Sequence, residues 1–276
     1  MLEEAEGRFE EAAVAFQRVN GIVLHHRLLG AEGAPTLVFS NSLGTDLRIW
    51  DAVAARLAGR FRLLFYDSRG HGLSEETPAP TRMTDHVEDL SALLGHHGIA
   101  GATVVGLSVG GMIAQGLAAL EPERVGRLVL IGTAHKIGTE ESWNARIAAV
   151  RENGIASIAA SVLERWFTAG YRREDNADFV GYRTMLLRSP VTGYVGTCAA
   201  LRDADLTEST RALGVPTLAM VGEEDGSTPP ELVRQTAALI RGAEFRVVPK
   251  AAHIACIERP DAVAELIAAF AGGSAR

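Results

Sequence analysis

The sequence predicts a doubly wound α/β fold, a mostly parallel sheet with a helical lid inserted after the sixth strand. Three observations support this fold class. Short apolar runs alternate with helical patterns over most of the chain, which is typical of strands buried between two layers of helices. One apolar strand runs through a glycine-rich corner into a helix around Ser108. Between residues 135 and 203 the alternation stops, and only helical patterns recur.

The predicted elements follow in chain order. After an Ala- and Glu-rich extension of residues 1–12, alternating apolar residues on both sides of Asn20-Gly21 predict a hairpin with a tight turn. The further predicted strands cover residues 36–40, 61–66, 103–107, 127–132, 215–222 and 243–248. The predicted helices cover residues 50–57, 85–94, 112–120, 143–150, 155–167, 179–187, 194–201, 231–240 and 261–270. We therefore expect one core, made of residues 13–134 and 204–276, with residues 135–203 as the lid.

Composition excludes several classes of function. A chain of 276 residues with 47% hydrophobic content can bury a large core. A net charge of −7 with dispersed basic residues gives no footprint for nucleic acid or anionic lipid. No apolar run approaches the roughly 18 residues that cross a bilayer, and the glutamate-rich start is unlike a secretory signal. We expect a cytoplasmic protein without a nucleic-acid or membrane partner.

The two cysteines carry no metal or disulfide signal. Cys198 and Cys256 stand far apart and outside any C-x-x-C spacing, so neither structural zinc nor an oxidising compartment is implied. We expect both to be small buried hydrophobes.

Ser108 is the candidate nucleophile. It is the central residue of Gly106-Leu107-Ser108-Val109-Gly110, a G-x-S-x-G motif that follows an apolar strand and precedes a helix. In this context the glycines let the backbone bend sharply and leave the hydroxyl free on the corner. An incidental serine in a glycine-rich turn is the alternative.

A serine hydroxyl needs a base to accept its proton and an acid to orient that base. Asp225 lies in the loop after one predicted strand, and His253 lies in the loop after the next. Because parallel strands end at the same edge of a sheet, both side chains are expected beside Ser108. Glu223 and Glu224 are alternative acids if the loop register differs.

The tetrahedral intermediate of acyl transfer needs two N–H donors for its oxyanion. Val109 follows the nucleophile at the start of a helix, so its amide is one candidate. The loop Asn41-Ser42-Leu43-Gly44 follows the third strand, and we expect a tight turn there to expose the Leu43 amide.

These residues resemble the α/β-hydrolase superfamily from about residue 13 to residue 270, and within it the 3-oxoadipate enol-lactonases. The stretches that carry the resemblance are Ser40-Asn41-Ser42-Leu43-Gly44-Thr45-Asp46-Leu47, Tyr66-Asp67-Ser68-Arg69-Gly70-His71-Gly72 and Gly106-Leu107-Ser108-Val109-Gly110-Gly111-Met112. The Asn-Ser-Leu-Gly stretch is the most specific, because most relatives carry His-Gly there. Trp166-Phe167-Thr168 and Ala204-Asp205-Leu206 also look like that family.

The resemblance implies a serine hydrolase that opens a small anionic enol-lactone to 3-oxoadipate without a metal or cofactor. Ser108 would attack the carbonyl, His253 would accept the proton, and Asp225 would orient the imidazole. The substrate carboxylate needs a cationic partner, and the predicted lid offers Lys136, Arg146, Arg165, Arg183 and Arg188.

Further substrate contacts are expected from Ser42, Trp143 and His135, with Trp166 either a cavity wall or a packing residue. Other readings stay open: a different carboxylesterase or lactonase of this fold, a cofactor-free perhydrolase, a carbon–carbon hydrolase, or a non-catalytic binding protein. The sequence also leaves a homo-oligomer open.

Overall fold

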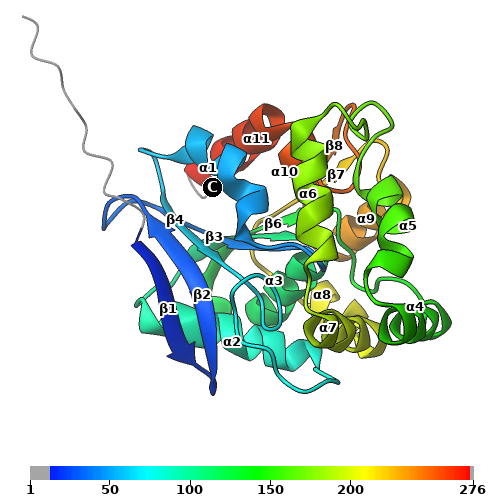
Figure 1. Cartoon of the computed structure of the whole chain (residues 1–276). Coiled ribbons are helices and arrows are strands. Elements are labelled where there is room, and N and C mark those ends of the chain that lie inside the picture. The colour runs from blue at the N-terminus through cyan, green and yellow to red at the C-terminus, as the bar shows by residue number, and fades with distance from the viewer. Residues whose placement is uncertain (1–12, 274–276) are drawn as a thin grey trace, which may run out of the picture.

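A single eight-stranded sheet forms the centre of the computed structural model, which describes residues 13–273 (Figure 1). The strand order is β1-β2-β4-β3-β5-β6-β7-β8. The strands are β1 (Ala13–Val19), β2 (Ile22–Leu29), β3 (Thr36–Ser40), β4 (Arg62–Tyr66), β5 (Ala102–Leu107), β6 (Val125–Ile131), β7 (Thr217–Gly222) and β8 (Glu244–Val248). β2 is antiparallel to β1 and β4, and the other described pairs are parallel. The predicted fold class is confirmed, and the extension of residues 1–12 lies outside the described residues.

The local sequence explains the strands. Every residue of β5 and of β7 is buried, as their continuous apolar runs predict for strands covered on both faces. Asn20 and Gly21 both have positive φ, at 45° and 79°, which is the geometry of the tight hairpin turn expected between β1 and β2.

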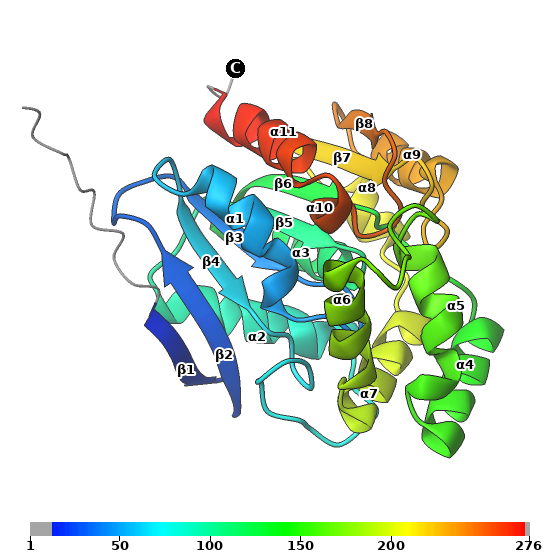
Figure 2. The same cartoon turned by 45° about the horizontal axis from the view of Figure 1, so that its top comes forward.

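Helices cover both faces of the sheet. α1 (Asp51–Leu57) packs with α11 (Pro260–Gly272) on one face, and α2 (Met83–His96) packs with α3 (Val109–Leu120) on the other (Figures 1 and 2). α9 (Pro230–Leu239) lies against β7. Among residues 13–273, no helix is long and apolar enough to span a membrane.

Some short elements were not predicted, because three to five residues are too few to show a helical period. They are α8 (Thr207–Arg211), α10 (Ala255–Glu258) and the 3₁₀ segments η1 (Leu47–Trp50) and η2 (Pro122–Arg124). The Asp46 side chain caps η1 by accepting from the Arg48 amide.

Four further helices lie between β6 and β7, where the helical insertion was predicted. They are α4 (Glu140–Asn153), α5 (Ala156–Trp166), α6 (Ala177–Leu187) and α7 (Val191–Asp203), and they gather at one end of the sheet (Figure 2). The loop after β3 reaches them, since a Cβ on Gly44 would lie 2.9 Å from Leu186 of α6 and 3.1 Å from Tyr194 of α7. The boundaries of a lid, at residues 135 and 203, stay a prediction.

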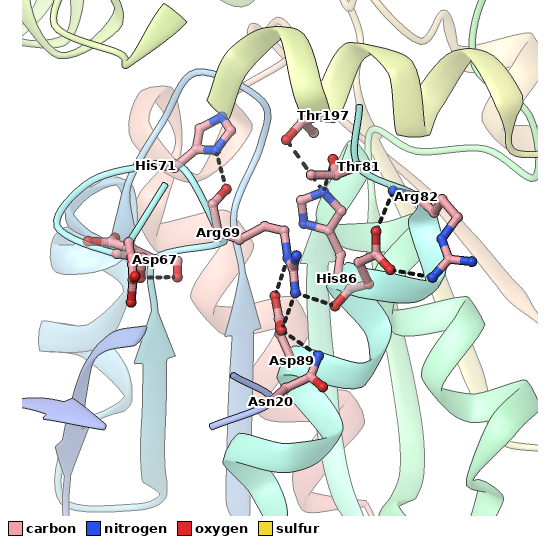
Figure 3. Close-up of polar contacts among 12 residues, drawn as sticks. Asn20, Asp67, Arg69, His71, Thr81, Arg82, His86, Asp89 and Thr197 are labelled. Carbon is pink, nitrogen blue, oxygen red and sulfur yellow. Dashed lines mark hydrogen bonds and ion pairs between the residues drawn. The ribbon is translucent and has the colours of Figure 1, made fainter. Parts of the chain in front are cut away.

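The loop after β4 is ordered by a buried polar cluster (Figure 3). Arg69 makes a bidentate ion pair with Asp89 of α2, with both N–O distances 2.6 Å, and Asn20 of the hairpin turn donates to the same carboxylate. His71 bonds the Arg69 carbonyl through Nδ1, at 3.1 Å, and does not line the cavity that holds Ser108. Gly70 of this loop packs directly on Gly193 of α7.

Candidate active site

The site lies where the direction of chain winding changes. From β3 the chain crosses to β4 on one side, and then to β5 on the other side of β3. In doubly wound sheets such a switch opens a crevice beyond the carboxyl ends of the two central strands. The Ser42–Gly44 loop follows β3 and Ser108 follows β5, so both reach this crevice.

Ser108 occupies a strained corner between β5 and α3. Its φ of 58° and ψ of −119° lie in a region that residues with a side chain rarely adopt, at a cost of about 1–3 kcal/mol. The flanking glycines are required sterically. A Cβ on Gly106 would lie 2.3 Å from the Gly110 carbonyl oxygen, and a Cβ on Gly110 would lie 2.2 Å from that of Ser40. The G-x-S-x-G pattern therefore reflects close backbone contacts on both sides of the serine.

Asp225 and His253 form a buried pair. His253 Nδ1 lies 2.9 Å from Asp225 Oδ2 and 3.1 Å from Oδ1, and the two side chains are 2% and 0% exposed. The amides of Ser227 and Thr228 and the Thr228 hydroxyl all donate to the carboxylate, at 2.8–2.9 Å. These donors hold the carboxylate in place, so the imidazole of His253 is fixed through it.

Ser108 and His253 line one cavity of about 240 Å³, together with Ser42, Leu43 and Trp143. The structure thus brings together the predicted nucleophile, the predicted base and three of the predicted neighbours. Asp225 lies directly behind His253 and does not line the cavity itself.

Of the two predicted oxyanion donors, Leu43 lines this cavity, and Val109 directly follows Ser108 in the chain. Thr45 N–H donates to the Ser42 carbonyl at 3.2 Å, and Gly44 has a φ of 77°, which makes Ser42–Thr45 a turn that needs glycine at its third position. Within residues 13–273 the Leu43 amide has no hydrogen-bond partner. Val109 is the first residue of α3, where an amide has no acceptor inside its own helix.

Two of the five candidate cations line the cavity, Arg146 of α4 and Arg165 of α5. In the described part of the chain, neither guanidinium lies within ion-pair distance of a carboxylate. Arg146 stacks on the Trp143 ring, 4.9 Å from its centroid. Burial, and next the positive charge of Arg146, lower the pKa of Arg165. Two arginines without a carboxylate partner among the described residues therefore line the same cavity as Ser108.

The other three candidate cations lie elsewhere. Lys136 pairs with Asp205, Arg183 pairs with Glu174, and Arg188 belongs to a separate depression on the surface.

Comparisons with known proteins identify the family. A family model described as the alpha/beta hydrolase fold matches residues 35–260. The chain belongs to this family. "3-Oxoadipate enol-lactonase 2" of Acinetobacter baylyi is 35% identical over 242 residues, 87% of this chain and 90% of that protein. The solved enol-lactonase of Burkholderia xenovorans is 36% identical, with a TM-score of 0.91, and the match covers 94% of this chain and 100% of that one.

The chain is therefore a hydrolase of the α/β-hydrolase fold, and its resemblance to enol-lactonases is confirmed. Esterases of the family are also similar: the pimeloyl-[acyl-carrier protein] methyl ester esterase of Pectobacterium carotovorum is 28% identical over 251 residues, 87% of this chain and 95% of that protein.

In this α/β-hydrolase the structure does not place His135 at the cavity. Its Nδ1 lies 2.9 Å from the Thr236 hydroxyl, and its backbone carbonyl accepts from Leu206. The chain turns toward α8 and α9 shortly after β6, so His135 lies outside the lining of the cavity that holds Ser108, and a substrate contact from it stays a prediction.

Among the polar lining residues that sequence analysis missed is Tyr194 of α7. Burial raises the pKa of its hydroxyl well above the usual range, so it stays protonated and can donate. No local signal marked it, because a tyrosine at the start of a helical pattern resembles an ordinary packing residue.

Proposed function

We propose that this protein is a serine hydrolase that opens 3-oxoadipate enol-lactone to 3-oxoadipate. The observation that carries the proposal is one cavity in which Ser108, backed by the His253–Asp225 pair, faces the unpaired guanidiniums of Arg146 and Arg165. Ser108 with the His253–Asp225 pair suits attack on an acyl carbonyl, and the two guanidiniums suit a substrate with a negative charge. The similarity to enol-lactonases supports the same choice.

The proposed reaction has two halves. Ser108 attacks the lactone carbonyl while His253 accepts the hydroxyl proton, and the amides of Leu43 and Val109 bind the oxyanion. The ring C–O bond then breaks, and His253 returns the proton to the enol oxygen, which stays tethered to the acyl-enzyme. In the second half His253 activates a water that releases the acyl group. The free enol then converts to the ketone.

Arg146 and Arg165 bind the substrate carboxylate in this proposal. A charged group left unpaired in a partly dry cavity is costly, and a carboxylate is the natural partner of a guanidinium fork. Trp143 would hold the Arg146 side chain in position by stacking. A cytoplasmic location and a homo-oligomeric state stay predictions.

A substrate panel tests the proposal. Initial rates are compared for the enol-lactone, for p-nitrophenyl acetate, and for a p-nitrophenyl monoester of a dicarboxylic acid. We expect the enol-lactone to have the highest kcat/KM, and the anionic monoester to exceed the neutral ester. Rapid turnover of neutral esters with none of the enol-lactone would instead favour a general carboxylesterase of the same fold, the second candidate that the esterase relative supports.

A further inference from the structure

We infer that Thr133 is a positioning residue of the oxyanion hole, acting through the peptide bond that follows the nucleophile. Its hydroxyl lies 2.6 Å from the carbonyl oxygen of Ser108 and donates to it. Thr133 does not line the cavity, and its side chain is fully buried. The Thr133 hydroxyl therefore acts on the site through its hydrogen bond to the Ser108 carbonyl. This inference rests on the proposed serine-hydrolase function.

The carbonyl of Ser108 and the N–H of Val109 belong to one rigid peptide plane and point in opposite directions. The ψ of Ser108, at −119°, rotates both groups together. A hydrogen bond that holds the oxygen therefore also sets where the Val109 N–H points. The hydrogen bond from Thr133 to the Ser108 carbonyl oxygen also polarises the peptide group. This polarisation makes the Val109 N–H a stronger hydrogen-bond donor.

The Ser108 carbonyl also accepts from the amides of Gly111 and Met112, at 2.9 and 3.3 Å. Both donors belong to α3 and hold the peptide against its own helix. Thr133 comes instead from the chain just after β6. It is therefore the contact that ties the orientation of this peptide to the sheet.

The side chain of Thr133 is itself held in place. A Cβ on Gly111 would lie 2.4 Å from Thr133 Cγ2 and 2.6 Å from Oγ1, so the threonine packs directly on the Gly111 backbone. This contact explains the second glycine of Val109-Gly110-Gly111, which the G-x-S-x-G motif does not require.

The residue before Thr133 contacts the acid and the base. Gly132 has a φ of 46°, and a Cβ there would lie 2.9 Å from Asp225 Oδ2 and 3.2 Å from His253 Nδ1. The dipeptide Gly132-Thr133 thus contacts the nucleophile's peptide on one side and the Asp225–His253 pair on the other. A small shift of this segment would alter all three together.

The test uses two variants of the whole chain. Thr133→Val keeps the shape and removes the hydroxyl, whereas Thr133→Ser keeps the hydroxyl and removes the methyl group. Removing an oxyanion donor outright lowers kcat by about 100- to 1,000-fold, and re-aiming one should cost less. For Thr133→Val we expect kcat to fall about 10-fold with KM changed less than 2-fold, and we expect Thr133→Ser to keep kcat within about 3-fold of wild type.

Calorimetric binding of an alkyl boronic acid, which forms a tetrahedral adduct on the serine, gives a readout independent of turnover. Its affinity should fall in Thr133→Val by about the same factor as kcat, while the affinity for adipate, a carboxylate ligand, stays unchanged. Equal boronate affinity in Thr133→Val and wild type would overturn the inference. Equal losses of kcat in Thr133→Val and Thr133→Ser would also overturn it. The rates are measured on p-nitrophenyl acetate and on the enol-lactone, so failure of the lactone alone counts against the proposed substrate and not against Thr133.

Discussion

At the scale of single residues, we expect the unpaired guanidiniums of Arg146 and Arg165 to give this α/β-hydrolase its substrate preference. The corner at Ser108 and the Asp225–His253 pair could serve any acyl group, because Ser108 and His253 would meet only the reacting atoms and Asp225 lies behind His253. Arg146 and Arg165 would contact the part of the substrate that does not react. Substrate choice is therefore expected to follow these two side chains.

Replacing either arginine tests this division of roles. In Arg146→Gln and Arg165→Gln, kcat/KM for the enol-lactone should fall about 10- to 100-fold, since a hydrogen bond to a charged group contributes about 1.5–3 kcal/mol. Activity on neutral p-nitrophenyl acetate should change less than 3-fold. Arg183→Gln is the matched control, because Arg183 pairs with Glu174 outside the cavity. Equal losses on the neutral ester would contradict a carboxylate-binding role.

At the scale of elements, α7 is seated on the core by direct backbone contact. A Cβ on Gly193 would lie 2.0 Å from the Gly70 carbonyl oxygen, so no side chain fits between the helix and the loop after β4. The next residue, Tyr194, lines the cavity and packs beside Gly44 of the loop with the Leu43 amide. The position of α7 thus sets one wall of the site.

Gly193→Ala should therefore destabilise the protein and lower activity together. Overpacking of this kind costs about 1–3 kcal/mol in the free energy of unfolding. Gly181→Ala in α6 is the control, because nothing lies within 4 Å of a Cβ there and alanine is the better helix former, so stability should stay equal or rise by up to about 1 kcal/mol. Urea unfolding of both variants measures the difference, and similar stabilities would show that the contact is not tight.

Elements with a strong local signal were predictable from the sequence. The corner at Ser108 has its glycines in place, and Asp225 and His253 lie in the loops after predicted strands. Which of the five candidate cations line the cavity depends on how α4 and α5 are rotated against the core. No local sequence pattern predicts that rotation, so Arg146 and Arg165 could not be singled out. The position of His135 depends on a turn toward Thr236, a residue about 100 positions later. Thr133 stayed hidden for the same reason, since its partner is 25 residues away.

At the scale of the whole molecule, buried histidines should make stability depend on pH. Burial first, and then the nearby charges of His71 and Arg69, lower the pKa of His86 to about 3. Burial also lowers the pKa of His71. Between about pH 3 and the unfolded value of about 6.5, the unfolded chain binds a proton at His86 that the folded chain does not. The free energy of unfolding should therefore fall as pH decreases below about 6.5, by up to about 1.4 kcal/mol per pH unit for this residue.

Urea unfolding between pH 7.5 and pH 4.5, on wild type and His86→Gln, measures this dependence. The variant is compared by its slope with pH rather than by its absolute stability, because His86 also contacts Thr81 and Thr197. We expect the free energy of unfolding to change less steeply with pH in His86→Gln than in wild type. Parallel slopes would exclude His86 as a source of the pH dependence.

The most direct test of the central claim is the loss of the enol-lactone's ultraviolet absorbance, followed in parallel with wild type and Ser108→Ala. We expect rapid loss with wild type, and a rate lower by a factor on the order of 10⁴ with a folded Ser108→Ala protein. A wild type no faster than spontaneous hydrolysis would contradict the proposed substrate, and equal rates in the two proteins would contradict Ser108 as the nucleophile.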